Sequence, residues 1–84
     1  MYIFATGTVT KPGEIGPYLD DEHLAMEQLK ADGVILNAFR FAEHTGVVSF
    51  LEAESIEVAG EQLGRLPFVE HGLMEFEFSE VVDV

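Results

Sequence analysis

Two ionisable residues stand side by side in a segment with helical spacing, Glu22 and His23. A carboxyl group and an imidazole are side chains that transfer protons near neutral pH. His23 lies at the edge of an apolar stripe, and Glu27, four residues on, can orient its ring. Glu22 lies nearer the centre of the stripe, where burial raises the pKa of a carboxyl while the helix start lowers it. Two interpretations stay open for these residues: catalytic or ligand-binding use, or a surface His23–Glu27 pair and a simple helix-start carboxylate.

A second group of residues has the composition of a small-ligand pocket. Arg40 stands in an apolar segment and can clamp a substrate carboxylate through two parallel hydrogen bonds, with pairing to a carboxylate of the protein as the alternative. Aromatic and small polar side chains are the other candidates for substrate binding: Phe4, Thr6, Asn37, Phe39 and Ser49. The alternative is that these side chains form the core of an interface between two copies of the chain.

Other ionisable residues carry weaker signals. Glu75 and Glu77 share one face of a strand, where they either lie in a desolvated site between two copies or protect a strand edge in water. His23, His44 and His71 show none of the close spacings of metal-binding histidines, so we expect no metal site. No glycine-rich phosphate-binding motif is present, and we expect no cofactor.

The composition limits the classes of partner. The 84 residues allow one small domain, residues 1–84, and the net charge of −12 disfavours binding to nucleic acid or to an anionic membrane. No apolar run is long enough to span a bilayer. The first residues lack the basic start of an export signal, so we expect a cytoplasmic protein. With no cysteine, the chain depends on packing or self-association for stability.

Alternating strand and helix patterns provide the elements that position these residues. Strands are predicted at 2–9, 34–42, 47–51 and 73–79, with a hairpin turn at 43–46. Helices are predicted at about 17–32, with its apolar stripe on Tyr18, Ala25, Met26 and Leu29, and from a cap at Ser55 to a stop before Pro67. The order β-α-β-β-α-β predicts a ferredoxin-like α+β fold with a four-stranded antiparallel sheet.

Both faces of two predicted strands are apolar. In strand 2–9, Ile3, Ala5 and Val9 oppose Tyr2 and Phe4, and in strand 34–42, Ile35, Phe39 and Phe41 oppose Val34, Leu36 and Ala38. Two helices cover only one face of such a sheet, so something must cover the other. We expect a second copy of the chain, as a homodimer packed sheet to sheet, with a higher oligomer left open.

Several of these residues resemble two known families. His23-Leu24, Leu29, Gly33, the run 67–73 and the opening Met1–Phe4 resemble the YCII-related family. The chain from Gly33 to Glu75 resembles the muconolactone isomerases, with matching residue types at Arg40, Ala42, His44, Ser49, Ser55, Glu57, Leu63, Leu66, Pro67 and Glu75. Within these families, His23 matches the YCII-related histidine, and Glu22 matches a helix glutamate of the isomerases. Leu66 replaces a YCII-related aspartate, while Phe4 and Thr6 replace a histidine and a lysine of the isomerases.

The resemblance implies a dimeric α+β barrel and a cofactor-free enzyme. The implied reaction is an acid–base isomerisation, or a related proton transfer, on a small lactone-like or cyclic organic acid. His23 would be the base or acid, supported by Glu22 or Glu27, and Arg40 or Asn37 would hold substrate oxygens in a cleft between the sheet and the first helix. The alternative is a non-catalytic module that binds a small ligand or stabilises a partner. An RNA-binding domain of this fold ranks last, because the chain lacks basic surface.

Overall fold

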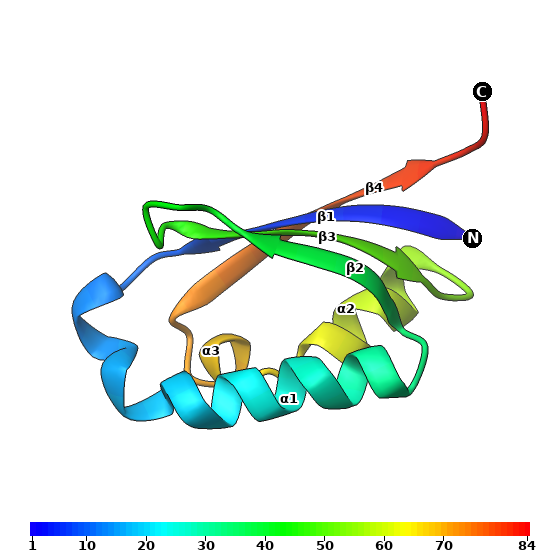
Figure 1. Cartoon of the computed structure of the whole chain (residues 1–84). Coiled ribbons are helices and arrows are strands. Elements are labelled where there is room, and N and C mark those ends of the chain that lie inside the picture. Colours follow the sequence, from blue (N-terminus) through cyan, green and yellow to red (C-terminus); the bar gives the residue numbers. More distant parts are fainter.

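The computed structural model describes all 84 residues and confirms the ferredoxin-like α+β arrangement. Its sheet has four antiparallel strands in the order β2-β3-β1-β4. The elements are β1 (Tyr2–Val9), η1 (Pro12–Glu14), η2 (Gly16–Tyr18), α1 (Leu19–Ala31), β2 (Ile35–Arg40), β3 (Gly46–Glu52), α2 (Ile56–Leu63), α3 (Pro67–Glu70) and β4 (Met74–Val81). All of the helices lie on one side of the sheet (Figure 1). None of them is long and apolar enough to cross a membrane.

The helix ends follow most of the residues that favour them, with three differences from the sequence prediction. Ser55 caps α2 as predicted, because its Oγ accepts a hydrogen bond from the Val58 N–H at 3.1 Å. The first helix begins at Leu19 and not at Pro17, since Gly16–Tyr18 forms the separate 3-10 turn η2. The short α3 was not predicted. The helix α2 ends at Leu63, with Gly64 at its C-cap, and not directly before Pro67. Pro67 has the backbone angle that suits the first position of a new helix.

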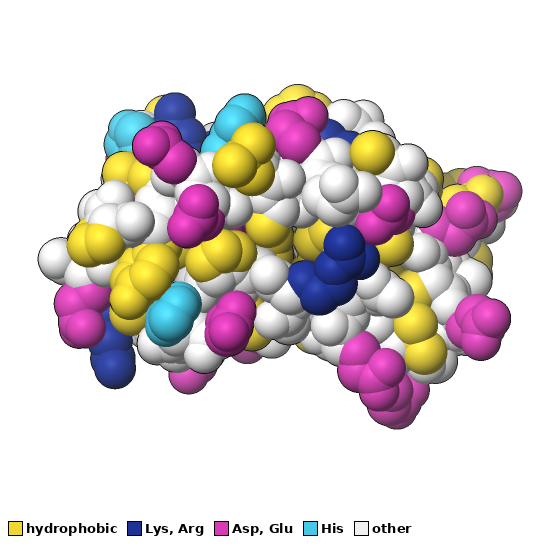
Figure 2. Space-filling model, turned by 90° about the horizontal axis from the view of Figure 1, so that it is seen from below, with side chains coloured by type: hydrophobic (Ala, Val, Ile, Leu, Met, Phe, Trp, Pro, Cys, Tyr) yellow, Lys and Arg dark blue, Asp and Glu magenta, His cyan; other side chains and the backbone are white.

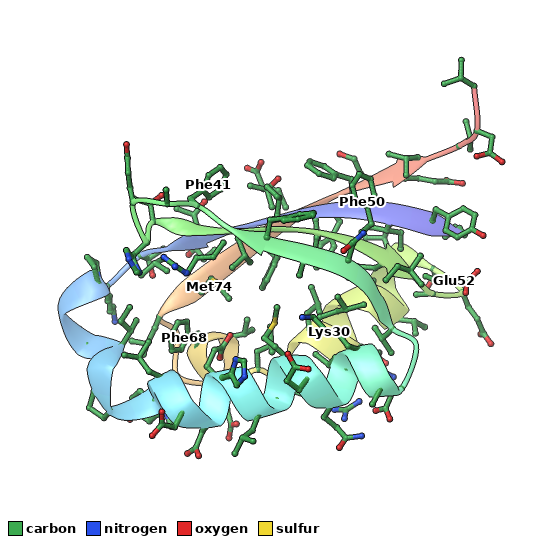
Figure 3. The ribbon with its side chains drawn as sticks, in the orientation of Figure 1. Lys30, Phe41, Phe50, Glu52, Phe68 and Met74 are labelled. Atoms are coloured by element: carbon green, nitrogen blue, oxygen red, sulfur yellow. The ribbon has the colours of Figure 1, made fainter.

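The core lies between the sheet and the helices. Leu29 of α1, Leu51 of β3 and Leu63 of α2 are almost completely buried. Burying one such aliphatic side chain contributes about 1.5–3 kcal/mol. Phe68 of α3 and Met74 of β4 also lie between the sheet and α1 (Figure 3). This packing fixes α1 and α3 against the same side of the sheet.

A bulge in β2 changes which of its side chains share a face. The register shifts between Ile35, opposite Leu51, and Asn37, opposite Phe50. The expectation that Ile35, Phe39 and Phe41 share one face was therefore wrong. One extra residue on the bulged strand reverses the alternation beyond it, so Ile35 and Ala38 lie on the helix side while Asn37 and Phe39 lie on the other.

The other face of the sheet is uncovered in the single chain. Phe41 and Phe50 point away from the helices (Figure 3), and the Phe50 ring lies 5.2 Å from the ring of Phe4. In β4 the strict alternation is confirmed. Met74 is buried on the helix side, while Glu75 and Glu77 are exposed and pair in register with Thr8 and Thr6 on the uncovered side. We call this surface the open face.

Candidate functional site

A cleft of about 340 Å³ lies between α1 and the hairpin end of the sheet. It is formed where α1, α3 and the β2–β3 hairpin come together. Its walls are apolar, and its ionisable groups come from α1 and the hairpin. The lining consists of Val9, Ile15, Leu19, Glu22, His23, Met26, Glu27, Lys30, Ala38, Phe39, Arg40, His44, Gly46, Val47, Phe68 and Met74.

Glu22 is the buried ionisable residue of this cleft. Its side chain projects from the first turn of α1, and the residue is only 9% exposed. One carboxyl oxygen, Oε1, accepts a hydrogen bond from the backbone N–H of Phe68 at 2.8 Å. The other oxygen accepts none from the protein and is not sealed from solvent. Burial raises the pKa of the Glu22 carboxyl, and the hydrogen bond from Phe68 partly offsets this rise.

The hydrogen bond of Glu22 also joins two helices. Leu66 precedes α3 in the capping position but has no side-chain acceptor, so it cannot satisfy the first N–H groups of that helix. The Glu22 carboxyl from α1 takes that role for Phe68. The same carboxyl is thus both a structural link and a chemically available group.

His23 lines the cleft, but it does not form the pair that its spacing suggested. No hydrogen bond joins it to Glu27, which instead accepts one from Lys30 at 3.4 Å. His23 is exposed, so its imidazole is free to contact a molecule in the cleft. Lys30 also lines the cleft and lies between α1 and the sheet (Figure 3).

Arg40 reaches the cleft from the end of β2. Its Nη1 lies 2.7 Å from Nδ1 of His44 and donates a longer hydrogen bond, 3.4 Å, to the carbonyl oxygen of Phe41. Both Arg40 and His44 line the cleft. Because arginine does not lose its proton, the His44 nitrogen is the acceptor. Arg40 forms no ion pair with a carboxylate of the protein, so the predicted alternative is not observed.

The structure does not bring the eight predicted site residues together. It gathers Glu22, His23 and Arg40 in the cleft, together with part of Phe39, whose side chain is 61% exposed on the open face. Three residues predicted to bind substrate also lie on the open face, away from the cleft: Phe4, Thr6 and Asn37. Ser49 is buried among core residues on the helix side and does not line the cleft. These four are therefore not grouped with Glu22: strand alternation separates the first three from it, and Ser49 is enclosed in the core.

Some lining residues were missed by sequence reasoning. Met26 and Lys30 follow Glu22 at intervals of four, so helical spacing carried a signal for both. His44 and Phe68 had no such signal. They reach the cleft through the hairpin turn and through α3, which depend on tertiary packing.

The charges around the cleft differ from those of the whole chain. Acidic side chains are spread over the helical side of the molecule, with few basic ones among them (Figure 2). The cleft nevertheless contains Lys30 and Arg40, two of the four basic residues, together with His23 and His44. No group of three or more histidine, aspartate or glutamate residues is placed to hold a metal ion. His71, the third histidine, stacks on Tyr18 with ring centres 4.2 Å apart.

Comparisons with known proteins place the fold. No protein-family model matches the sequence, and no curated protein matches it. Muconolactone isomerase superposes with a TM-score of 0.78 and 21% identity, covering 100% of this chain and 91% of the isomerase. The 5-chloro-2-hydroxyhydroquinone dehydrochlorinase of Burkholderia phenoliruptrix AC1100, in complex with 2,5-dihydroxybenzoquinone, superposes with a TM-score of 0.70 and 18% identity. This match covers 95% of this chain and 93% of the dehydrochlorinase. The resemblance is therefore confirmed at the level of the fold: this chain has the muconolactone isomerase-like fold.

Proposed function

We propose that this protein catalyses a proton transfer on a small cyclic organic acid or lactone, without a cofactor. The observation that carries the proposal is the Glu22 carboxyl, which is buried at the cleft with a raised pKa and has one oxygen free of protein hydrogen bonds. Both similar structures have names that denote chemistry on small organic molecules: isomerisation of a lactone, and loss of HCl from a chlorinated ring. Both reactions need a group that takes up or gives a proton.

In the proposed reaction, the Glu22 carboxylate removes a proton from the carbon next to a carbonyl group. The electron pair of the broken C–H bond moves onto the carbonyl oxygen, and a proton then returns to another carbon, so that the double bond moves and the composition is unchanged. Burial makes the carboxylate a stronger base than an exposed glutamate. His23, which also lines the cleft, supplies the proton that returns to the other carbon, and both residues regain their starting protonation by exchange with water.

The test is exchange of substrate protons with deuterium in heavy water, followed by NMR. The first probes are muconolactone and 5-chloro-2-hydroxyhydroquinone, the compounds in the names of the two similar proteins. Glu22→Gln keeps an oxygen that can accept the Phe68 hydrogen bond but cannot accept a proton from carbon, so we expect exchange to slow by about 10²–10⁴-fold. Asp21→Asn is the matched control, since Asp21 is exposed, precedes Glu22 and does not line the cleft.

Two results would contradict the proposal in different ways. Exchange at the wild-type rate in Glu22→Gln would remove Glu22 from the chemistry. Binding of the probes with no exchange, together with a His23→Ala variant that changes only affinity, would favour the non-catalytic ligand-binding module.

We also propose that the open face binds a second copy of the chain, sheet to sheet. Large apolar side chains exposed on this side of the protein include Tyr2, Leu36, Phe39, Phe41 and Phe50. A shallow hollow of about 310 Å³ lies among Tyr2, Leu36, Phe50 and the end of β4. Exposed apolar patches of this kind mark association surfaces in soluble proteins. The cleft lies on the opposite side of the sheet, so association leaves it accessible.

A further inference from the structure

Arg40 differs from Lys30, the other basic residue of the cleft, in having no carboxylate partner; Lys11, which also has none, lies outside the cleft. Lys30 pairs with Glu27 and Arg65 pairs with Asp32, whereas Arg40 forms no ion pair in a chain with 16 acidic residues. A guanidinium group so placed keeps its positive charge available to a ligand. Its position in the cleft makes that ligand a molecule bound beside Glu22.

His44 holds Arg40 without neutralising it. The imidazole Nδ1 accepts the hydrogen bond from Arg40 Nη1 at 2.7 Å, and an accepting nitrogen carries no proton. His44 has a backbone φ of 62°, in the left-handed region, and its N–H donates to the Phe41 carbonyl at 2.9 Å. A side chain other than glycine is uncommon at such an angle. The hairpin turn therefore maintains an unusual backbone conformation that places the imidazole against the guanidinium.

The remaining donors of Arg40 are not used by the protein. Both of its hydrogen bonds to the protein come from Nη1, so Nε and Nη2 have no protein acceptor. Two adjacent N–H groups of a guanidinium match the two oxygens of a carboxylate. Because the net charge of −12 repels anions from the molecule as a whole, a carboxylate needs such a local cation to bind.

We infer that Arg40, positioned by His44, is the subsite for a carboxylate group of the ligand. The ligand class is then a small ring bearing a carboxylate, held at the hairpin end of the cleft. The orientation of its reacting carbon toward Glu22 rests on the proposed function, whereas the carboxylate subsite does not. His44 acts here through Arg40 and is a positioning residue.

The first test compares benzoate with benzamide, a neutral molecule of nearly the same shape, in NMR titrations of backbone amides. We expect benzoate to shift the amides around Arg40 and His44 and to bind at least about tenfold more tightly than benzamide, because a charge-assisted hydrogen-bond pair is lost in the amide. Arg40→Gln should remove this preference. Arg65→Gln is the control, since Arg65 lies outside the cleft and pairs with Asp32.

The second test separates positioning by His44 from a structural role. His44→Asn keeps an acceptor atom attached to the same γ carbon and tolerates the left-handed backbone, so benzoate affinity should stay within about threefold of wild type. His44→Gly suits the backbone equally well but removes the acceptor, and should weaken benzoate binding about tenfold. Amide spectra of both variants verify that the hairpin is folded.

Three outcomes would overturn the inference. They are an absence of benzoate binding, equal binding of benzoate and benzamide, and unchanged benzoate affinity in Arg40→Gln. Full affinity in His44→Gly would overturn the positioning role. Glu22→Gln should still bind benzoate, so a failure of the proposed proton transfer is distinguishable from a failure of this subsite.

Discussion

The two faces of the sheet differ in what they carry, although every strand supplies both. Between the sheet and the helices the packing is mainly aliphatic, and Glu22 and Arg40 line the cleft at one end of it. The open face has exposed aromatic rings such as Phe50, with Glu75 and Glu77 at its β4 edge. The difference separates two roles: the helix side provides the core and a site for chemistry, and the open face provides a surface for association.

The largest expected contrast comes from two neighbours in β3 that point to opposite faces. Leu51 is completely buried on the helix side, whereas Phe50 is 44% exposed on the open face. Leu51→Ala should lower the free energy of unfolding by about 2–5 kcal/mol, because it leaves a cavity in the core. Phe50→Ala should lower it by only about 1 kcal/mol in dilute protein, through loss of its contact with Phe4. Urea unfolding measures both; equal losses would mean that the two faces contribute alike.

Most of the fold follows from local patterns in the sequence. The 2.0 and 3.6 periodicities, the Ser55 cap and the stop at Gly33, which has φ 80°, predict the order of elements and hence the sheet. The bulge in β2 could not be predicted in the same way. One unpaired residue near Leu36 has no distinctive composition, yet it decides whether Phe39 or Ala38 faces the helices.

The candidate site was predictable only in part, for a related reason. Glu22 and His23 share one helix, so their proximity follows from spacing alone. Ser49 and Phe4 are brought near each other by strand pairing, but Ser49 faces the core while Phe4 lies across the sheet. The contact between His44 and Arg40 depends on a left-handed turn residue that no motif marks. Proximity within one element was thus readable, although the predicted contact between His23 and Glu27 did not form. Contacts between elements required the register.

An intermediate effect is expected on association through the open face. Phe50→Glu places a charge in the exposed aromatic surface, where association would bury it without a partner. We expect the wild-type protein to sediment as a dimer or a larger oligomer. The dissociation constant of the Phe50→Glu oligomer should be at least about tenfold higher than that of the wild type. Leu24→Glu is the control, because Leu24 is 66% exposed on α1, away from the sheet. A wild-type protein that sediments as a monomer would contradict the proposed association.

The smallest effect concerns Glu22 on the helix side and the pH dependence of the free energy of unfolding. Burial raises the pKa of Glu22 in the folded chain above its ordinary value of 4.5. The folded state therefore holds this proton more tightly than the unfolded state does. The resulting stabilisation is fully present below the ordinary pKa and is lost as the pH rises through the raised one.

Glu22→Gln cannot ionise, so it should not show that loss. We expect its free energy of unfolding, relative to wild type, to increase as the pH rises from below 4.5 toward neutrality, in urea unfolding at a series of pH values. Asp21→Asn, exposed on the same turn, is the control for removing a negative charge at this helix start. A difference between Glu22→Gln and wild type that is constant with pH would mean that Glu22 is well solvated. A rising difference would mean that the ionised carboxylate at the cleft destabilises the fold, as expected of a group retained for its chemistry.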